Sequence, residues 1–240
     1  MNVNKTDRHI SQQYDKGLQN ICSRILSIGR LVEEQVGDAV LAFTTGDLEM
    51  ASSVISHEYR LNELEIHTDE ESARLLALQQ PVAYDLRLIV IIIKINSDLE
   101  RIGDLATEIA RMAFHNTETT LPKKRYKKLR NLSNQVQEIL HDTIVAFEQG
   151  DAAAASCVME KEFSKDDNYD AITHQMTKLL EKDPRDVKKK MDIMWAASAL
   201  ERIGDRARSI CEYITILEKG CDSSFSNDND MSKEICGDNQ

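Results

Sequence analysis

The sequence has few of the residues that make tight turns. Among its 240 residues there are only 9 Gly and 3 Pro, and aromatic residues make up 5%. Because strands need turns, and turns need glycine, proline and asparagine, this composition is poor for a sandwich or a barrel. A hydrophobic fraction of 41% with a charged fraction of 30% instead favours long helices. We therefore expect an all-α protein.

Other absences narrow the class of protein further. The longest apolar run is Leu88–Ile93, which is too short to cross a bilayer, and the first residues contain no apolar signal core. We therefore expect a cytoplasmic location. The five Cys include no C-x-x-C pair, so neither a disulfide framework nor a thiolate zinc site is expected. The net charge of −11 disfavours nucleic acid as a partner, since phosphate contacts need an excess of Lys and Arg.

What the sequence does contain is an internal repeat. The string Glu-Arg-Ile-Gly-Asp occurs at 100–104 and again at 201–205, and Ala-Phe-x-x-Gly-Asp occurs at 42–47 and at 146–151. Two anchors in the same order, at offsets of 101 and 104, indicate a duplicated unit. We expect a first three-helix unit over 1–118, a second over 119–219, and a disordered C-terminal tail over 220–240, which lacks periodicity and is rich in Ser, Asn and Asp.

Each unit is predicted to contain three long helices. In the first unit a helix is indicated by apolar residues that recur every three or four positions and stop at Gly46. A second helix follows Asp47, and a third runs from Pro81 to about Asn116. The second unit should have helices over about 123–149, 151–181 and 184–219. The apolar stripe of the first helix consists of Ile21, Ile25, Ile28, Val32, Val36, Ala39 and Phe43.

The run Leu88–Ile93 by itself could also be a buried strand. Its counterpart 101 residues later is Lys189–Met194, and an Ala-rich stretch follows it. Such a segment is a good helix and a poor strand. Because duplicated units should share one structure, we predict helices in both. The expected architecture is two tandem, pseudo-symmetric three-helix bundles with six long helices.

Acidic residues recur beside the apolar stripes of these helices. On the second helix of each unit an acid is followed four residues later by Asn or Asp, and the third helices carry the acids of the two Glu-Arg-Ile-Gly-Asp strings. Residues four apart lie on one helix face, so each pair can act together. The predicted metal ligands are Glu58, Asn62, Glu100 and Asp104 in the first unit and Glu162, Asp166, Glu201 and Asp205 in the second.

A hard cation would remove the strain that such pairs create. Two buried carboxylates repel each other, and burial without compensation raises their pKa. Oxygen ligands without Cys or His suit Mg²⁺, Mn²⁺, Ca²⁺ or oxidised iron. Gly103 and Gly204 within the two strings predict a close approach of a backbone or a ligand. The alternative is a solvated acidic face paired with Arg101 or Arg202.

The sequence shows no catalytic constellation. Glu-x-x-His occurs only at Glu138 and His141, in one unit, which is too little for a di-iron oxidase. There is no Walker loop, nucleophile elbow or GxGxxG. We therefore expect no enzymatic activity, and a carboxylate-bridged metal-dependent hydrolase is the alternative. A basic cluster at the joint of the units is either an exposed first turn or a contact for an acidic partner or an anionic membrane surface. It consists of Lys123, Lys124, Arg125, Lys127, Lys128 and Arg130.

Three segments closely resemble the PhoU family of phosphate-uptake regulators. They are the duplicated Glu-Arg-Ile-Gly-Asp, the Q-P-x-A-x-D-L-R segment at 80–87 and the ending ERIGDRARSICEYI, and the resemblance covers about residues 8–220. It implies two three-helix bundles related by pseudo-twofold symmetry. It also implies E(D)xxxD motifs that hold Mg, Mn or Fe ions, which are multinuclear in some members. Asn62 departs from that motif, so the first site should bind metal less tightly or hold fewer ions.

The resemblance further implies a function and partners. Members of the family act as negative regulators of the Pho regulon, the phosphate-starvation response. They are accessory to the phosphate ABC transporter, and they are thought to link the ATPase subunit of that transporter to the membrane sensor histidine kinase. Homodimers are usual. We therefore expect a cytoplasmic homodimer that is peripheral to the membrane through its partners and regulates phosphate uptake and phosphate-starvation signalling.

Overall fold

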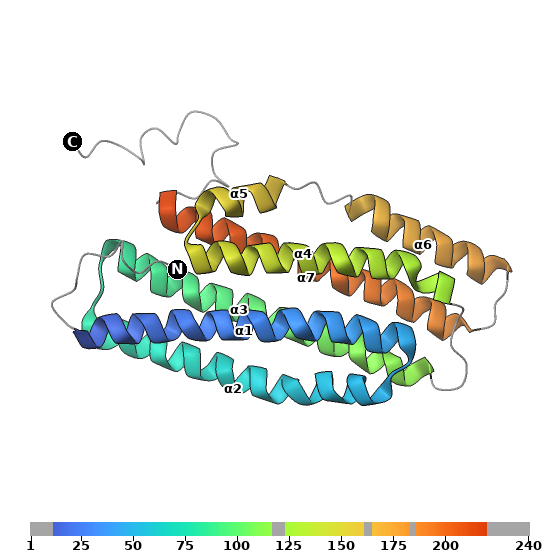
Figure 1. Ribbon diagram of the computed structural model, residues 1–240, viewed down its shortest axis with the longest axis horizontal. Coiled ribbons are helices and arrows are strands. Elements are labelled where there is room, and N and C mark those ends of the chain that lie inside the picture. The colour runs from blue at the N-terminus through green and yellow to red at the C-terminus, as the bar shows by residue number, and fades with distance from the viewer. Residues whose placement is uncertain (1–11, 117–122, 161–164, 183–185, 220–240) are drawn as a thin grey trace.

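The computed structural model is all-α in the part of the chain that it describes, which is residues 12–116, 123–160, 165–182 and 186–219 (Figure 1). This confirms the predicted fold class, and Leu88–Ile93 is helical. The described residues form seven α-helices: α1 (Gln12–Thr45), α2 (Leu48–Gln79), α3 (Ala83–Met112), α4 (Lys127–Gln149), α5 (Ala152–Glu160), α6 (Lys165–Lys182) and α7 (Val187–Lys219). Short 3₁₀ turns follow α3 at Ala113–Asn116 and precede α4 at Lys123–Tyr126.

The expectation of six long helices differs from this result in the second half of the chain. There the segment predicted as one helix over 151–181 contains α5, which ends at Glu160, and α6, which begins at Lys165, while residues 161–164 lie outside the described residues. The sequence at this point reads Ser-Lys-Asp-Asp-Asn over 164–168, and Ser, Asp and Asn favour helix ends over helix interiors. Pro184 and the predicted tail over 220–240 lie outside the described residues.

The predicted boundaries at the two Gly-Asp pairs are confirmed in detail. Gly46 and Gly150 have φ angles of 76° and 64°, in the left-handed region where glycine ends a helix without strain. Asp47 then caps α2, because its carboxylate accepts a hydrogen bond of 3.0 Å from the backbone N–H of Met50. Asp151 caps α5 in the same way by accepting from two backbone N–H groups at 2.9 Å.

These caps give a first testable prediction. Asp47→Ala and Asp151→Ala should each lower the free energy of unfolding by about 1 kcal/mol, because each leaves backbone donors of the following helix without a protein acceptor. Urea denaturation followed by circular dichroism measures both. Asp47→Asn and Asp151→Asn are the matched controls, since asparagine is also a good cap. An equal loss in the Asn and Ala variants would show that the caps are not the cause.

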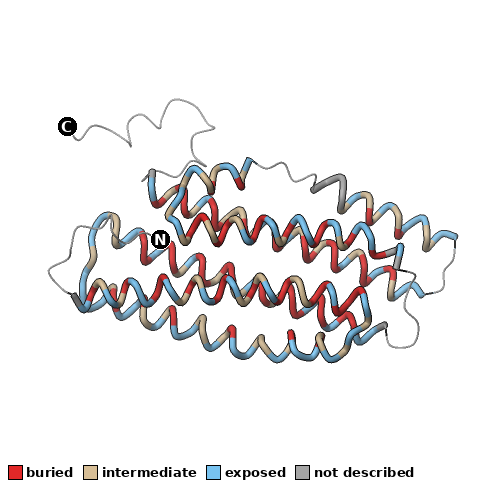
Figure 2. Tube along the Cα trace, viewed as in Figure 1, coloured by how far each residue is buried: buried red, intermediate tan, exposed pale blue. Residues whose placement is uncertain are grey.

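The core lies along the inward faces of the helices. All seven residues of the predicted α1 stripe are at most 2% exposed, and in Figure 2 buried positions recur along the sides of the helices that face one another. No helix among the described residues is long and apolar enough to span a membrane.

The chain forms two groups of helices that pack side by side (Figure 1). Helices α1, α2 and α3 pack on one another, as do α4 to α7, and contacts of α3 with α7 and of α1 with α4 join the groups. Polar pairs also cross the joint. Arg206 of α7 donates to Asp98 of α3 at 2.9 Å, and His115 lies 3.3 Å from the buried Asp192 of α7.

Candidate functional site

The candidate site lies between α2 and α3, where two antiparallel helices approach closely. A side chain at Gly103 would collide with Leu61 of α2, which is 1% exposed. Gly103 therefore lets the side chain of Leu61 pack directly against the backbone of α3. The sequence predicted the close approach of a backbone or a ligand at this glycine, and the group that approaches is a leucine side chain. The polar residues of the two helices are consequently held at short range along the rim of this contact.

Two of the predicted ligands, Glu100 and Asp104, lie together, but Glu58 does not join them. Glu58 accepts a hydrogen bond of 2.7 Å from Arg111. Arg111 is seven residues beyond Asp104 on α3, which is about 10 Å along the helix. Glu58 is thus the acidic half of an ion pair in the structure. Asn62 is half-buried in α2, one turn closer to Asp104 than Glu58 is.

The α2 acids that do approach Glu100 and Asp104 are Glu65 and Asp69. Burial, followed by the charges of Asp104 and Glu65 and a hydrogen bond with Asp104, raises the pKa of Glu100 to about 7. Burial and the charges of Asp69 and Asp104 also raise the pKa of Glu65, and Arg101 partly offsets this. The four carboxyl groups therefore interact electrostatically along the line where α2 meets α3. We call this row of acids, Glu65, Asp69, Glu100 and Asp104, the α2–α3 groove. The proton between Glu100 and Asp104 relieves part of their repulsion.

Two amide oxygens beside these acids have no donor. Asn96 donates through Nδ2 to the carbonyl of Glu65 at 3.0 Å and to the carboxylate of Asp69 at 2.9 Å, while its buried Oδ1 accepts nothing. The buried Oδ1 of Asn62 likewise has no donor. Buried acceptors without partners are costly, and a cation in the groove would satisfy them. As the side chains stand, no three His, Cys, Asp or Glu within the described residues form a group that could hold a metal ion.

A signal for Glu65 and Asp69 is present in the sequence. Residues 65–69 read Glu-Ile-His-Thr-Asp, an E-x-x-x-D string like that at 100–104. At the offset of 101 its counterparts are Asp166 and Asp170, a D-x-x-x-D pair. The offset of 104, taken from the Ala-Phe-x-x-Gly-Asp anchor, shifts the register of the second helix by three residues. With that offset Asp166 corresponds to Asn62 rather than to Glu65. Glu58, four residues before Asn62 and beside the apolar stripe, then becomes the predicted partner of Asn62.

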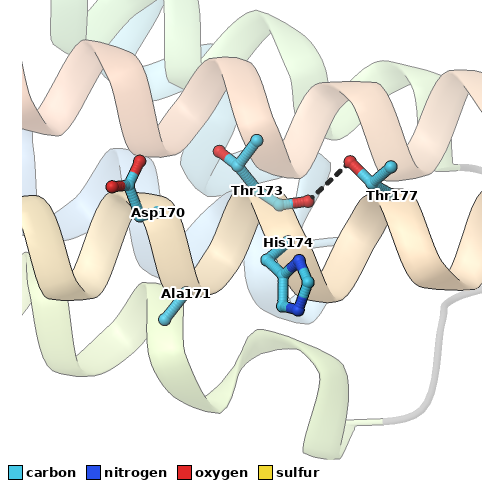
Figure 3. Close-up of a pocket in the computed structure, with 5 residues that line it drawn as sticks. All are labelled: Asp170, Ala171, Thr173, His174 and Thr177. Atoms are coloured by element: carbon cyan, nitrogen blue, oxygen red, sulfur yellow. Dashed lines mark hydrogen bonds between the residues drawn. The ribbon is translucent and has the colours of Figure 1, made fainter.

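The second half of the chain carries the counterpart positions in a less complete form. Glu162 and the side chain of Asp166 lie outside the described residues. Glu201 is half-buried and Asp205 is exposed on α7. Asp170, the counterpart of Asp69, lines an open depression in the surface with a volume of about 580 Å³. Figure 3 shows Asp170, Thr173 and Thr177 on one side of α6, with Ala171 and His174 on the other.

The basic cluster near the start of α4 is exposed at three of its described residues, and Arg130 is half-buried. Lys124, Lys127 and Lys128 face solvent, and Lys128 donates to the carbonyl of Ala171 in α6 at 3.3 Å. The side chains of Lys123 and Arg125 lie outside the described residues. This arrangement fits an exposed first turn, with one lysine tying α4 to α6.

The raised pKa of Glu100 predicts a dependence of stability on pH. The pKa is about 7 in the folded chain against an ordinary value of 4.5. Folding therefore favours the protonated acid, and this contribution is complete below pH 4.5 and is lost as the pH rises through 7. In metal-free buffer, Glu100→Gln should match the parent in Tm at pH 4 and exceed it at pH 8. Glu108→Gln, an exposed change on the same helix, is the control. Parallel Tm curves for Glu100→Gln and the parent would contradict the prediction.

Comparison with known proteins places these features in a family. A family model described as "PhoU domain" matches residues 25–113 and again residues 129–214. The two matches fall on the two halves identified by the internal repeat. They cover most of the chain and include all four carboxylates of the α2–α3 groove.

Relatives of similar length show the same likeness. The chain is 37% identical to a Pseudomonas putida protein named "Phosphate-specific transport system accessory protein PhoU homolog", over 99% of this chain and 93% of that protein. It is 32% identical to the Escherichia coli K12 protein named "Phosphate-specific transport system accessory protein PhoU", over 99% of this chain and 97% of that one.

Solved structures agree with this result. The crystal structure of PhoU from Pseudomonas aeruginosa matches with a TM-score of 0.83 and 37% identity, covering 87% of this chain and 100% of that one. The PhoU regulatory protein of a phosphate transport system from Streptococcus pneumoniae matches with a TM-score of 0.80 and 30% identity, covering 88% of this chain and 99% of that one.

Proposed function

Because the chain belongs to the PhoU family, we propose that it is a regulator of phosphate uptake and a negative regulator of phosphate-starvation signalling. The observation that carries this proposal is the match along nearly the whole length of relatives named as accessory proteins of phosphate transport systems. No enzymatic activity is part of the proposal. The protein acts by contact with other proteins.

The proposed partners are those that the family resemblance implies. The chain contacts the ATPase subunit of the phosphate transporter and the sensor histidine kinase, from the cytoplasmic side, as a homodimer that is peripheral to the membrane through these partners. Its repeats are proposed to be two pseudo-symmetric three-helix units over 1–118 and 119–219, with α5 and α6 together in the place of one helix. The two matches of the family model support this division.

We also propose that the carboxylates bind Mg, Mn or Fe ions. In the first half the groove of Glu65, Asp69, Glu100 and Asp104, with the amide oxygen of Asn62, offers oxygen ligands of the kind that hard cations prefer. The raised pKa of Glu100 and the unpartnered amide oxygens support this assignment. Holding an ion there requires the carboxylates to rotate toward one another. In the second half the proposed ligands are Asp166, Asp170, Glu201 and Asp205. Glu58 in the first half and Glu162 in the second are secondary candidates.

A reporter strain tests the regulatory role. In a bacterium that lacks its own PhoU protein, a reporter of phosphate-starvation genes should be active in rich phosphate, and this chain should silence it. Glu100→Gln with Asp104→Asn should weaken the silencing, and Glu108→Gln should not. Failure to silence while the chain is folded and abundant in the cells, and while the host's own PhoU does silence, would contradict the proposal.

Metal binding is tested separately on the purified chain. A cation that binds only the folded state raises Tm, so Mn²⁺ or Mg²⁺ at millimolar concentration should raise the Tm of the parent, and the double variant Glu100→Gln with Asp104→Asn should lose this response. If the Tm of the parent does not change with added metal, the proposal that these acids bind a metal ion is contradicted.

A metal-dependent hydrolase is the second candidate function. One observation favours it, which is a carboxyl group with a pKa near 7, the range in which a general acid or base is most effective. Turnover of phosphoesters with added Mn²⁺, lost in Glu100→Gln, would support it. If the protein binds the metal but hydrolyses no phosphoester, the hydrolase is contradicted and only the regulatory function remains.

A further inference from the structure

A second polar hollow lies between α1 and α2, at the end of the bundle away from the α1–α2 turn. It has a volume of about 210 Å³ and is lined by side chains one turn apart on each helix. Its floor is formed by Gly17 and the buried Leu75, where an added Cβ at Gly17 would lie 2.7 Å from a methyl group of Leu75. Since a water molecule occupies about 30 Å³ in the liquid, the hollow has room for a small ion and several waters.

The charges of this hollow differ in sign from those of the whole protein. Lys16 on the α1 wall and Arg74 on the α2 wall both line it, and within the part of the chain that the structure describes neither makes an ion pair. The one acid in the lining, Glu71, is paired with Arg24 at 3.2 Å. The lining therefore contains two cationic side chains and one carboxylate that is already paired with Arg24, in a protein with a net charge of −11.

The charged side chains dominate the electrostatic potential in the hollow, because the partial charges of the two helix ends nearby have opposite signs and largely cancel. The positive end of α1 and the negative end of α2 meet here. Arg74 can offer a planar fork of donors to an oxyanion, Lys16 a mobile positive charge, and the amide of Asn20 a further donor. The apolar floor lowers the local dielectric and strengthens these interactions.

We propose that this hollow is a binding site for inorganic phosphate. Lys16 and Arg74 neutralise the anion from opposite walls, and Glu71, held in place by Arg24, accepts a hydrogen bond from the phosphate hydroxyl. At neutral pH phosphate always keeps at least one proton, whereas sulfate has none. The carboxylate of Glu71 therefore attracts the protonated anion and repels sulfate, which gives the site a preference between two ions of similar size and shape.

The site is confined to the first half of the chain. At the offset of 101 the counterparts of Glu71 and Arg74 are Ile172 and Gln175. Leu75, which forms the floor, has an apolar counterpart in Met176, so the packing position is repeated while the charged positions are not. Because the second unit matches the same family model without these charges, the fold itself does not require Glu71 and Arg74 at these positions.

Calorimetric titration of the purified full chain with sodium phosphate and with sodium sulfate, at low ionic strength, tests the proposal. We expect phosphate to bind with a Kd on the order of 1 mM and sulfate at least about tenfold more weakly, one tenfold step being about 1.4 kcal/mol. Lys16→Gln with Arg74→Gln should weaken phosphate binding at least about tenfold. The control, Arg60→Gln with Lys178→Gln, removes two exposed charges elsewhere and should bind like the parent.

Glu71→Gln separates this site from general attraction of anions. It should bring the phosphate and sulfate affinities to within about twofold of each other, since the acceptor that distinguishes them is gone. Absence of phosphate binding to the folded parent, or equal binding in the Lys16 and Arg74 double variant, would overturn the proposal. The regulatory role is measured by the reporter strain, so either proposal can fail while the other stands.

Discussion

Replacing Gly103 by valine is expected to lower the free energy of unfolding by about 2–3 kcal/mol, because the new side chain has no space to enter. A Cβ at this position already collides with the side chain of Leu61, which is buried in the core. For a chain of this size the loss corresponds to a fall in Tm of about 5–10 °C. The α2–α3 groove should open at the same time, so the variant should also lose any metal-dependent rise in Tm.

Gly37 provides the matched control for this experiment. It is also in a helix, but a Cβ there would meet only the amide end of Gln137, at 2.8 Å, which can move. Gly37→Ala should therefore be neutral or stabilising by up to about 1 kcal/mol, the gain in helix propensity. The variant with both Leu61→Ala and Gly103→Val should lose less stability than the sum of the losses of the two single variants, because alanine at position 61 leaves space for the valine. Simple additivity of the two changes would show that their contact is not what makes Gly103 necessary.

The second large effect is expected at the joint between the two helix groups. Asp98 is 5% exposed, and its partner Arg206 lies 2.9 Å away. Arg206→Leu should lower the free energy of unfolding by about 2–3 kcal/mol, since it leaves a buried carboxylate without its counter-charge. The expected loss is smaller than for a fully buried pair because Arg206 is partly exposed. Chemical denaturation at neutral pH measures it.

The other half of the chain suggests the compensating change. At the offset of 101 the counterparts of Asp98 and Arg206 are Ala199 and Leu105, both apolar and buried. The double variant Asp98→Ala with Arg206→Leu should therefore lie within about 1 kcal/mol of the parent, because apolar groups can replace a buried ion pair at little cost. If the double variant were less stable than Arg206→Leu alone, the pair would not be the source of the effect.

The candidate site was only partly predictable from the sequence. Glu100 and Asp104 follow from the repeated string, and the structure brings them together. Glu58 follows from the same reasoning but pairs with Arg111, because which α2 residue faces Asp104 depends on the register of two packed helices. Glu58 and Glu65 are seven residues apart, about two helical turns. Both therefore lie on the same face of α2, and the apolar pattern alone does not choose between them.

The sequence by itself determined the helical class, the duplication and the helix ends at Gly46 and Gly150. These features depend on the spacing of nearby residues and on the conformational freedom of single residues, and both can be read directly from the sequence. Only the tertiary structure decided which acids share a groove, that Asp98 meets Arg206, and that Lys16 and Arg74 line one hollow. Such pairings join residues distant in sequence, and their register is set by how side chains such as Leu61 pack against neighbouring helices.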